Sequence, residues 1–159
     1  MWHRKGCNTT ETQTCAFRAC SGWGRRTAIG ACWGSSRFRK THPRPRGATR
    51  ALVLTPTREL ALQILEHLND LAIHTPSTGA AVIGGVGMGP QEHAFRSGVD
   101  VIIATPGRLL DHLRAPYARM GSLEHLVIDE ADRMLDMGFL PEIRRVLRHL
   151  PARRQTLFF

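Results

Sequence analysis

The sequence predicts an α/β protein in which a parallel sheet is flanked by helices. Short apolar runs alternate along the chain with longer stretches whose apolar residues recur every three or four positions. The runs, such as Val101–Ala104 (VIIA), are apolar at consecutive positions, which is typical of strands buried on both faces of a parallel sheet. Strands that alternate with helices are joined by right-handed crossovers, so both faces of the sheet are expected to be covered.

The strands are predicted from short β-branched or aliphatic runs, and the helices from apolar residues on one helical face. The first helix rests on Leu60, Ala61, Ile64, Leu65, Leu68 and Leu71, and the last on Leu140, Ile143, Val146, Leu147 and Leu150, opposed by Arg144, Arg145 and Arg148. In chain order we expect a strand at 51–54, a helix from about 60 to 71, a strand at 80–83, a short helix at 91–96, a strand at 101–104, a helix at 107–113, a strand at 126–128, a helix at 140–150 and a strand at 156–159. Thr156–Phe159 is expected to be cut short by the end of the chain.

Length and composition place the chain among soluble globular proteins. Its 159 residues suit one domain, and its 42% hydrophobic content includes no apolar run near the roughly 20 residues of a membrane span. Arg18, Arg25 and Arg26 interrupt any apolar segment near the N-terminus, which argues against a secretory signal. We therefore expect a cytoplasmic protein without membrane contact.

The charge and composition divide the chain near residue 43. The formal net charge of the chain is +9. Residues 51–159 hold 11 of the 22 basic residues and 12 of the 13 acids, so the excess of positive charge lies in the first third of the chain. The four cysteines and three tryptophans fall there as well. We expect residues 1–43 to be an irregular basic segment and residues 44–159 to be the folded domain.

The four cysteines leave two interpretations open. They are Cys7, Cys15, Cys20 and Cys32, and their spacing contains no C-x-x-C pair. A zinc site would need unusual geometry, whereas reduced thiols in an irregular segment need none. The basic run from Arg37 to Arg50 is read either as a nonspecific contact for RNA phosphates or as a solvated arm.

Two strand ends carry the same pattern, in which a threonine and a proline precede an arginine. They are TPTR at Thr55–Arg58 and TPGR at Thr105–Arg108. A threonine caps a helix and proline suits its first position, so each arginine is expected in a first helical turn. Free N–H groups at a helix start attract phosphate, and an arginine strengthens that attraction. One copy is explained by an efficient helix start alone, but two copies in one sheet predict a paired anion-binding surface.

Two further strand ends carry candidate chemistry. Gly84-Gly85 allows backbone to approach a ligand closely, although a glycine pair also forms ordinary turns. Asp129, Glu130 and Asp132 follow the apolar run at 126–128. Acids at a strand end hold hydrated Mg²⁺ against nucleotide phosphates, and the alternative is a helix start enriched in acids.

The ordered motifs PTRELA (Pro56–Ala61), GG (84–85), TPGR (Thr105–Arg108) and DEAD (Asp129–Asp132) resemble the DEAD-box ATP-dependent RNA helicases, particularly the bacterial members. The string VIDEADRMLDMGF (Val127–Phe139) resembles them too, and the resemblance covers about residues 44–159. It implies the first RecA-like domain of a P-loop NTPase fold. A related DNA translocase is disfavoured because Asp132 completes DEAD rather than another variant.

The resemblance also implies roles for individual residues, with ATP and Mg²⁺ as cofactors. Asp129 would hold Mg²⁺ through water, Glu130 would activate the hydrolytic water, and Asp132 would link the ATP site to interdomain contacts. The residues implied to line the backbone of single-stranded or short duplex RNA are Pro56, Thr57, Arg58, Gly84, Gly85, Thr105, Pro106, Gly107 and Arg108. A second RecA-like domain, which the sequence does not include, would close over the same strand.

The family's glycine-rich phosphate loop is not found in the sequence. Lys40 and Thr41 end a near-match, Gly34–Thr41, in which Arg39 stands where the loop needs glycine. Arginine resists the backbone angles that such a loop adopts, and the prolines that follow leave no room for a crossover helix before Ala51. We therefore expect no working phosphate loop at Lys40.

The domain is thus expected to be incomplete at both ends. One reading is an RNA helicase that couples ATP hydrolysis to RNA binding and unwinding in the complete protein, and the alternative is a catalytically inactive RNA-binding remnant. In either case this chain alone is expected to show no RNA-stimulated ATP hydrolysis. We also hypothesise a reading-frame discrepancy or misassigned start within residues 1–43. A Gly-x-Gly-Lys-Thr-like string in another frame upstream of Ala51 would support it, and its absence from the coding sequence would refute it.

Overall fold

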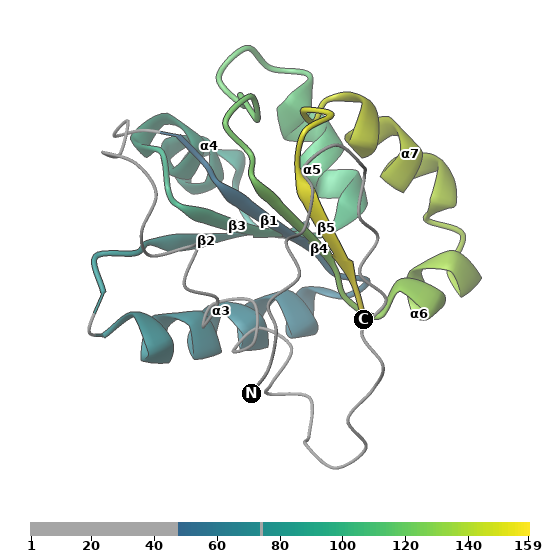
Figure 1. Cartoon of the computed structure of the whole chain (residues 1–159), viewed down its shortest axis with the longest axis horizontal. Coiled ribbons are helices and arrows are strands. Elements are labelled where there is room, and N and C mark those ends of the chain that lie inside the picture. Colours follow the sequence, from purple (N-terminus) through teal and green to yellow (C-terminus); the bar gives the residue numbers. More distant parts are fainter. Residues whose placement is uncertain (1–47, 74) are drawn as a thin grey trace, which may run out of the picture.

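The structure is a computed structural model that describes residues 48–73 and 75–159, and these form a five-stranded parallel sheet with helices on both faces (Figure 1). The strand order is β2-β3-β1-β4-β5, and every neighbouring pair is parallel. The strands are β1 (Ala51–Leu54), β2 (Gly79–Val82), β3 (Val101–Ala104), β4 (His125–Ile128) and β5 (Gln155–Phe158). The predicted fold class is confirmed.

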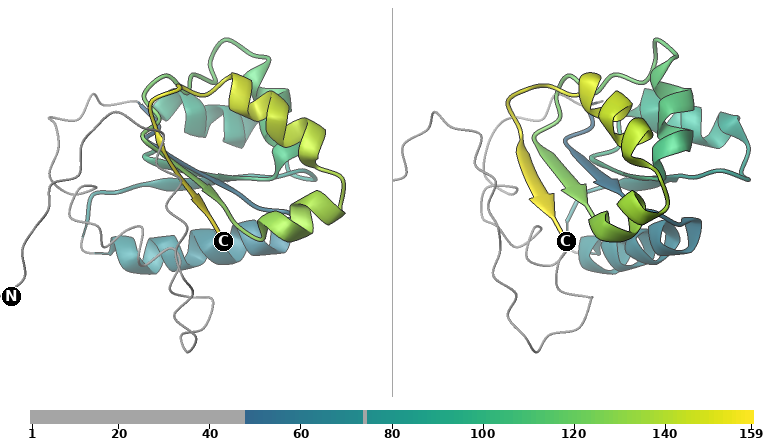
Figure 2. Two further views of the ribbon diagram at one scale, coloured as in Figure 1. Left: turned by 45° about the vertical axis from the view of Figure 1, so that its right-hand side comes forward. Right: turned by 90° about the vertical axis from the view of Figure 1, so that its right-hand side faces the viewer.

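One long helix covers one face of the sheet, and three helices cover the other (Figure 2). The helices are α3 (Arg58–Ala72), α4 (Met88–Ser97), α5 (Pro106–Leu113), α6 (Ala131–Asp136) and α7 (Leu140–Arg148). In the part of the chain that the structure describes, α3 covers one face, and α4, α5 and α7 lie on the opposite face. No helix in residues 48–73 or 75–159 is long and apolar enough to span a membrane.

Each face of the sheet has its own apolar core, because alternate side chains of a strand point to opposite faces. On the α3 face, Val53 and Ile103 of the strands pack with Ala61, Ile64 and Leu68 of the helix. The strand residues of the opposite core are Leu52, Leu54, Val82, Ile102, Ala104, Leu126 and Ile128, which pack against α4, α5, α6 and α7. The three central strands β1, β3 and β4 are buried throughout, as their continuous apolar sequences predict.

The parallel register brings the carboxyl ends of the strands to one edge of the sheet. Leu54 at the end of β1 is paired with Ala104 of β3 on one side and with Ile128 of β4 on the other. The bonding continues one residue further, since the Thr55 amide donates to the Ala104 carbonyl at 3.0 Å and the Asp129 amide donates to the Leu54 carbonyl at 3.0 Å. The segments after β1, β3 and β4 therefore leave the sheet side by side.

Two helices differ from the sequence prediction. Helix α4 begins at Met88 rather than at residue 91, and α6 was not predicted as a separate element. Six residues are too few to show an apolar period, and only Met134 of α6 is buried. Leu71, predicted on the apolar face of α3, lies in its last turn with 46% of its surface exposed.

Candidate nucleic-acid interface and nucleotide site

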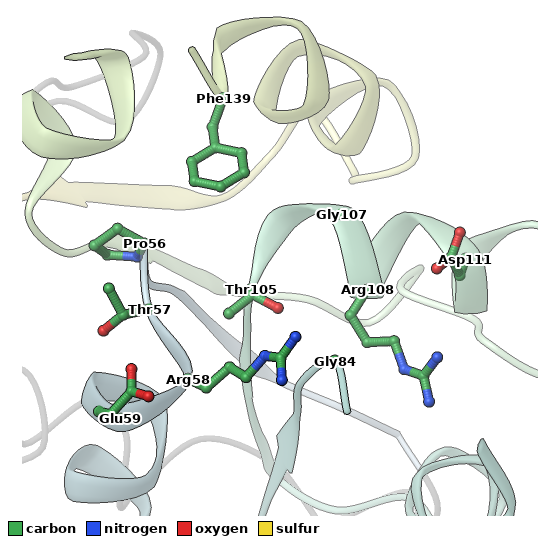
Figure 3. Close-up of a pocket in the computed structure, with 10 residues that line it drawn as sticks. All are labelled: Pro56, Thr57, Arg58, Glu59, Gly84, Thr105, Gly107, Arg108, Asp111 and Phe139. Carbon is green, nitrogen blue, oxygen red and sulfur yellow. The ribbon is translucent and has the colours of Figure 1, made fainter. Parts of the chain in front are cut away.

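A cleft of about 500 Å³ opens at the carboxyl edge of the sheet, where α3 and α5 begin (Figure 3). Its lining combines the two arginine-bearing strand ends with one of the paired glycines. The lining residues are Pro56, Thr57, Arg58, Glu59, Gly84, Thr105, Gly107, Arg108, Asp111 and Phe139. Of the residues predicted to contact RNA, all but Gly85 and Pro106 line this cleft.

The first TPxR motif begins its helix later than its sequence suggests. Thr57 is the N-cap of α3, and its hydroxyl accepts a hydrogen bond from the Leu60 amide at 3.2 Å. Pro56, expected at the first helical position, therefore lies before the cap. Thr55 is fully buried, and its hydroxyl donates to the Thr57 carbonyl at 3.2 Å. That bond places Arg58 at the first position of α3, beside the free amides of the helix start.

The second motif follows the predicted arrangement more closely. Thr105 is the N-cap of α5, Pro106 occupies the first turn, and Arg108 follows in the same turn. The Thr105 side chain makes no capping hydrogen bond in this structure, unlike that of Thr57. Figure 3 shows it on the cleft side, between the two arginines. Pro106 is buried under the helix start, which explains why it does not line the cleft.

The paired glycines make room for the Arg58 guanidinium. A Cβ at Gly84 would stand 3.2 Å from Arg58 Nη2, and one at Gly85 would collide with Arg58 Nη1. Gly85 also has φ +80°, in the left-handed region that glycine adopts without strain. The group that lies against both glycines in this structure is the Arg58 side chain, and the approach of a ligand to this backbone stays a prediction.

Arg108 is held by the segment that follows the glycines. Its Nη2 donates to the Val86 carbonyl at 2.5 Å, and its Nε donates to the side-chain oxygen of Gln91 at 3.3 Å. Gln91 in turn bonds His112, whose ring is fully buried behind the cleft. Burial lowers the pKa of His112, and the nearby charge of Arg108 lowers this pKa further.

Three cleft residues were not predicted from the sequence. Glu59 and Asp111 flank the predicted arginines along α3 and α5, and Phe139 projects into the cleft from the start of α7 (Figure 3). Asp111 could have been found from its i,i+3 spacing to Arg108 on α5, whereas Glu59 is adjacent to Arg58 in the sequence and has no such spacing signal. No local sequence pattern indicates that Phe139 reaches the cleft, because its position depends on the path that the chain takes through α6.

The acidic motif lies at the same sheet edge, one strand away from the TPTR segment. Asp129 follows β4 directly, and its carboxylate accepts from the Glu130 amide at 3.2 Å. Glu130 has φ 51°, unusual for a residue with a side chain, and its carboxylate accepts from Arg133 Nη1 at 3.0 Å. Asp132 is exposed in the first turn of α6 and accepts from the Arg133 amide. None of the three acids lines the cleft. The acidic motif therefore lies beside the cleft that contains the two arginines, and not inside it.

The acidic motif is the candidate binding site for Mg²⁺. No cluster of three or more His, Cys, Asp or Glu side chains able to hold a metal occurs in residues 48–73 and 75–159. Mg²⁺ is commonly bound by one or two carboxylates together with water and substrate phosphates, so a single strand-end carboxylate is compatible with it. Asp129 fits that role. Lys40, Thr41 and the cysteines lie outside the described residues.

The comparison with protein families decides the identity of the domain. The family model DEAD/DEAH box helicase matches residues 11–159 of the chain. The chain belongs to the DEAD/DEAH box helicase family. The match confirms the resemblance stated on the four motifs, and the parallel sheet is that of a RecA-like domain.

Curated relatives of this DEAD/DEAH box domain are similar to most of the chain. DEAD-box ATP-dependent RNA helicase 40 of Oryza sativa subsp. japonica is 44% identical over 126 residues, which is 79% of this chain and 16% of the relative. ATP-dependent RNA helicase DDX18 of Homo sapiens is 44% identical over 116 residues, 72% of the chain and 17% of the relative. ATP-dependent RNA helicase HAS1 of Pyricularia oryzae is 46% identical over 116 residues, 73% of the chain and 20% of the relative. The chain thus matches no more than about a fifth of these relatives. They are eukaryotic, and the closer likeness to bacterial members stays a prediction.

Proposed function

We propose that this chain is part of the first RecA-like domain of an ATP-dependent RNA helicase. In the complete protein, ATP binding and hydrolysis are coupled to the binding and unwinding of RNA. The observation that carries the proposal is the cleft itself, in which two separate helix starts, each with an arginine, face one another. Family membership and the names of the relatives support the RNA and ATP parts of the proposal.

The cleft suits a ribose-phosphate strand. Helices α3 and α5 both begin at it, so free backbone amides and two guanidinium groups converge on one surface. Such groups contact phosphate oxygens, which are the same in every nucleotide, and therefore position a strand without reading its sequence. Sequence-independent binding is what an enzyme that separates many different duplexes requires.

The acids supply the nucleotide side of the proposal. We assign Asp129 to Mg²⁺, through water, and Glu130 to the hydrolytic water. A bound Mg²⁺ would neutralise charge on the nucleotide phosphates. Glu130 lies next to Asp129, and its Oε2 accepts from Arg133 in this structure, while a carboxylate has a second oxygen that can accept a proton from water. Asp132, exposed in the first turn of α6, is assigned to contacts between domains.

The remaining assignments concern partners and location. We propose that a second RecA-like domain closes over the RNA held in the cleft, because the cleft formed by residues 48–73 and 75–159 is open on one side. We further propose a cytoplasmic location, where the RNA and ATP assigned to this domain are present.

RNA binding by the purified chain tests the proposal. Fluorescence anisotropy with labelled oligouridine should show an affinity that falls as salt is raised. Arg58→Ala and Arg108→Ala should each reduce the slope of this salt dependence by about 0.7 for every phosphate that the arginine neutralises. Arg148→Ala is the matched control, since Arg148 is exposed on α7 and does not line the cleft. Equal effects of all three substitutions would contradict the assigned cleft.

A further inference from the structure

We propose that Gln91 is a positioning residue that joins the turn after β2 to Arg108, so that two walls of the cleft move as one unit. The turn consists of residues 83–87 and includes both paired glycines. The inference rests on the proposed function, because it assigns Gln91 a part in RNA binding by the cleft. Gln91 itself does not line the cleft.

The amide nitrogen of Gln91 holds the turn from inside. Gln91 is 4% exposed, and its Nε2 lies 3.0 Å from the Ile83 carbonyl. The same nitrogen lies 3.4 Å from the Val86 carbonyl and 3.3 Å from that of Gly87. One buried amide thus contacts three backbone carbonyls along the turn, and its bond to the Ile83 carbonyl is buried.

The amide oxygen of Gln91 holds Arg108. Its Oε1 accepts from Arg108 Nε at 3.3 Å and from His112 Nε2 at 3.1 Å. The backbone carbonyls near Nε2 need a hydrogen-bond donor, and the Arg108 guanidinium near Oε1 needs an acceptor. Only one orientation of the Gln91 amide satisfies both needs. Arg108 Nη2 also donates to the Val86 carbonyl, so the arginine and the turn are linked both directly and through Gln91.

His112 and Tyr117 fix Gln91 from behind. Because Oε1 of Gln91 cannot donate, Nε2 of His112 must carry the proton, and Nδ1 is then an acceptor for the Tyr117 hydroxyl at 3.0 Å. His112 is fully buried, and Phe95 packs beside it with ring centroids 5.2 Å apart. The orientation of Gln91 is therefore set by a packed interior and not by solvent.

The turn held by Gln91 also contacts the other arginine of the cleft. Gly84 and Gly85 lie against the Arg58 guanidinium, so a shift of the turn would displace Arg58 as well as Arg108. Gln91 is thus connected to both predicted phosphate contacts without touching the ligand. Removal of its amide is expected to weaken RNA binding through these two side chains.

The test is a double-substitution cycle in the full chain, with oligouridine as the probe. Gln91→Met keeps the approximate size of the side chain and removes both polar ends, and it should weaken binding about tenfold. In a background that carries both Arg58→Met and Arg108→Met the same change should cost much less, because both groups that Gln91 positions are gone. A residue that matters only for folding would weaken both backgrounds equally, and circular dichroism reports whether each variant is folded.

The outcomes separate this inference from the proposed function. If Arg58→Ala and Arg108→Ala leave RNA affinity unchanged, the cleft is not the RNA site and the proposed function fails. If they weaken binding but folded Gln91→Met does not, or if its effect persists in the background that lacks both arginines, the positioning role is overturned. If Gln91→Met does not fold, NMR on the unsubstituted chain provides the test. Slow exchange with water of the Gln91 side-chain amide protons and of the Arg108 Nε–H would support the link. Fast exchange of either would refute it.

Discussion

The guanidinium of Arg58 occupies the space in which a side chain at Gly85 would stand. An alanine there would meet Arg58 Nη1 and would also be forced into the left-handed region, at φ +80°. The arginine of one strand end and the glycine of the next therefore depend on each other. This relationship explains why the two motifs, which are separated in sequence by a helix and a strand, belong to one surface.

Gly85→Ala should weaken oligouridine binding and destabilise the fold. The left-handed conformation costs a residue with a side chain roughly 1–2 kcal/mol, and the displaced guanidinium leaves its place in the cleft. Gly121→Ala is the matched control, because a Cβ at Gly121 meets nothing within 4 Å. Anisotropy and urea unfolding measure the two effects, and an unchanged affinity in folded Gly85→Ala would contradict the dependence of Arg58 on this glycine.

Thr57→Ala and Thr105→Ala should differ in stability although the two sequence motifs look alike. Thr57 caps α3 with a 3.2 Å bond, so its replacement should cost about 1 kcal/mol of unfolding free energy. The Thr105 side chain makes no such bond, and its replacement should cost less. Urea denaturation of both variants checks the difference, and equal decreases in stability would show that the capping bond contributes nothing specific.

Stability should fall as the pH drops below about 6.5, the ordinary pKa of histidine. Burial lowers the pKa of both His112 and His125 in the folded chain. The unfolded state therefore binds more protons in this range, and protonation favours unfolding. Urea midpoints measured on either side of the ordinary histidine pKa report the decrease. His112→Gln should reduce this pH dependence, and an unchanged dependence would mean that His112 titrates equally in both states.

Asp129→Ala should separate the nucleotide site from the RNA cleft. Asp129 does not line the cleft, so oligouridine affinity should stay within about twofold of the original, a difference of about 0.4 kcal/mol. Affinity for ATP that requires Mg²⁺ should fall, because the assigned carboxylate is removed. Titration with fluorescent ATP, with and without Mg²⁺, measures this. ATP binding that survives the substitution in the presence of Mg²⁺ would contradict the role assigned to Asp129.

The sequence predicted the centre of the sheet well because β1, β3 and β4 are buried on both faces. Runs such as Val101–Ala104 have no polar position and cannot serve as exposed segments, so their interpretation had few alternatives. The strand ends were then placed at one edge by the parallel arrangement alone. For that reason the prediction that Arg58 and Arg108 share a surface needed no knowledge of side-chain packing.

The features that sequence reasoning missed depend on contacts between distant residues. Gln91 and His112 are 21 positions apart, and nothing in either neighbourhood indicates that they meet in the interior. Phe139 reaches the cleft only because α6 and the turn after it return the chain there. In the first TPxR motif the N-cap is Thr57 and not Thr55, whose hydroxyl donates to the Thr57 carbonyl, and the repeated pattern concealed this local difference.

The most direct measurement of the central claim is NMR mapping of oligouridine on the labelled chain. Backbone amide signals of Arg58, Gly84 and Gly107, which line the cleft, should shift on titration, and those of the exposed residues of α7 should not. The shifts should weaken as salt is raised, because the contacts are made to phosphates. Shifts confined to the outer face of α7, with none around Arg58 and Arg108, would contradict the account.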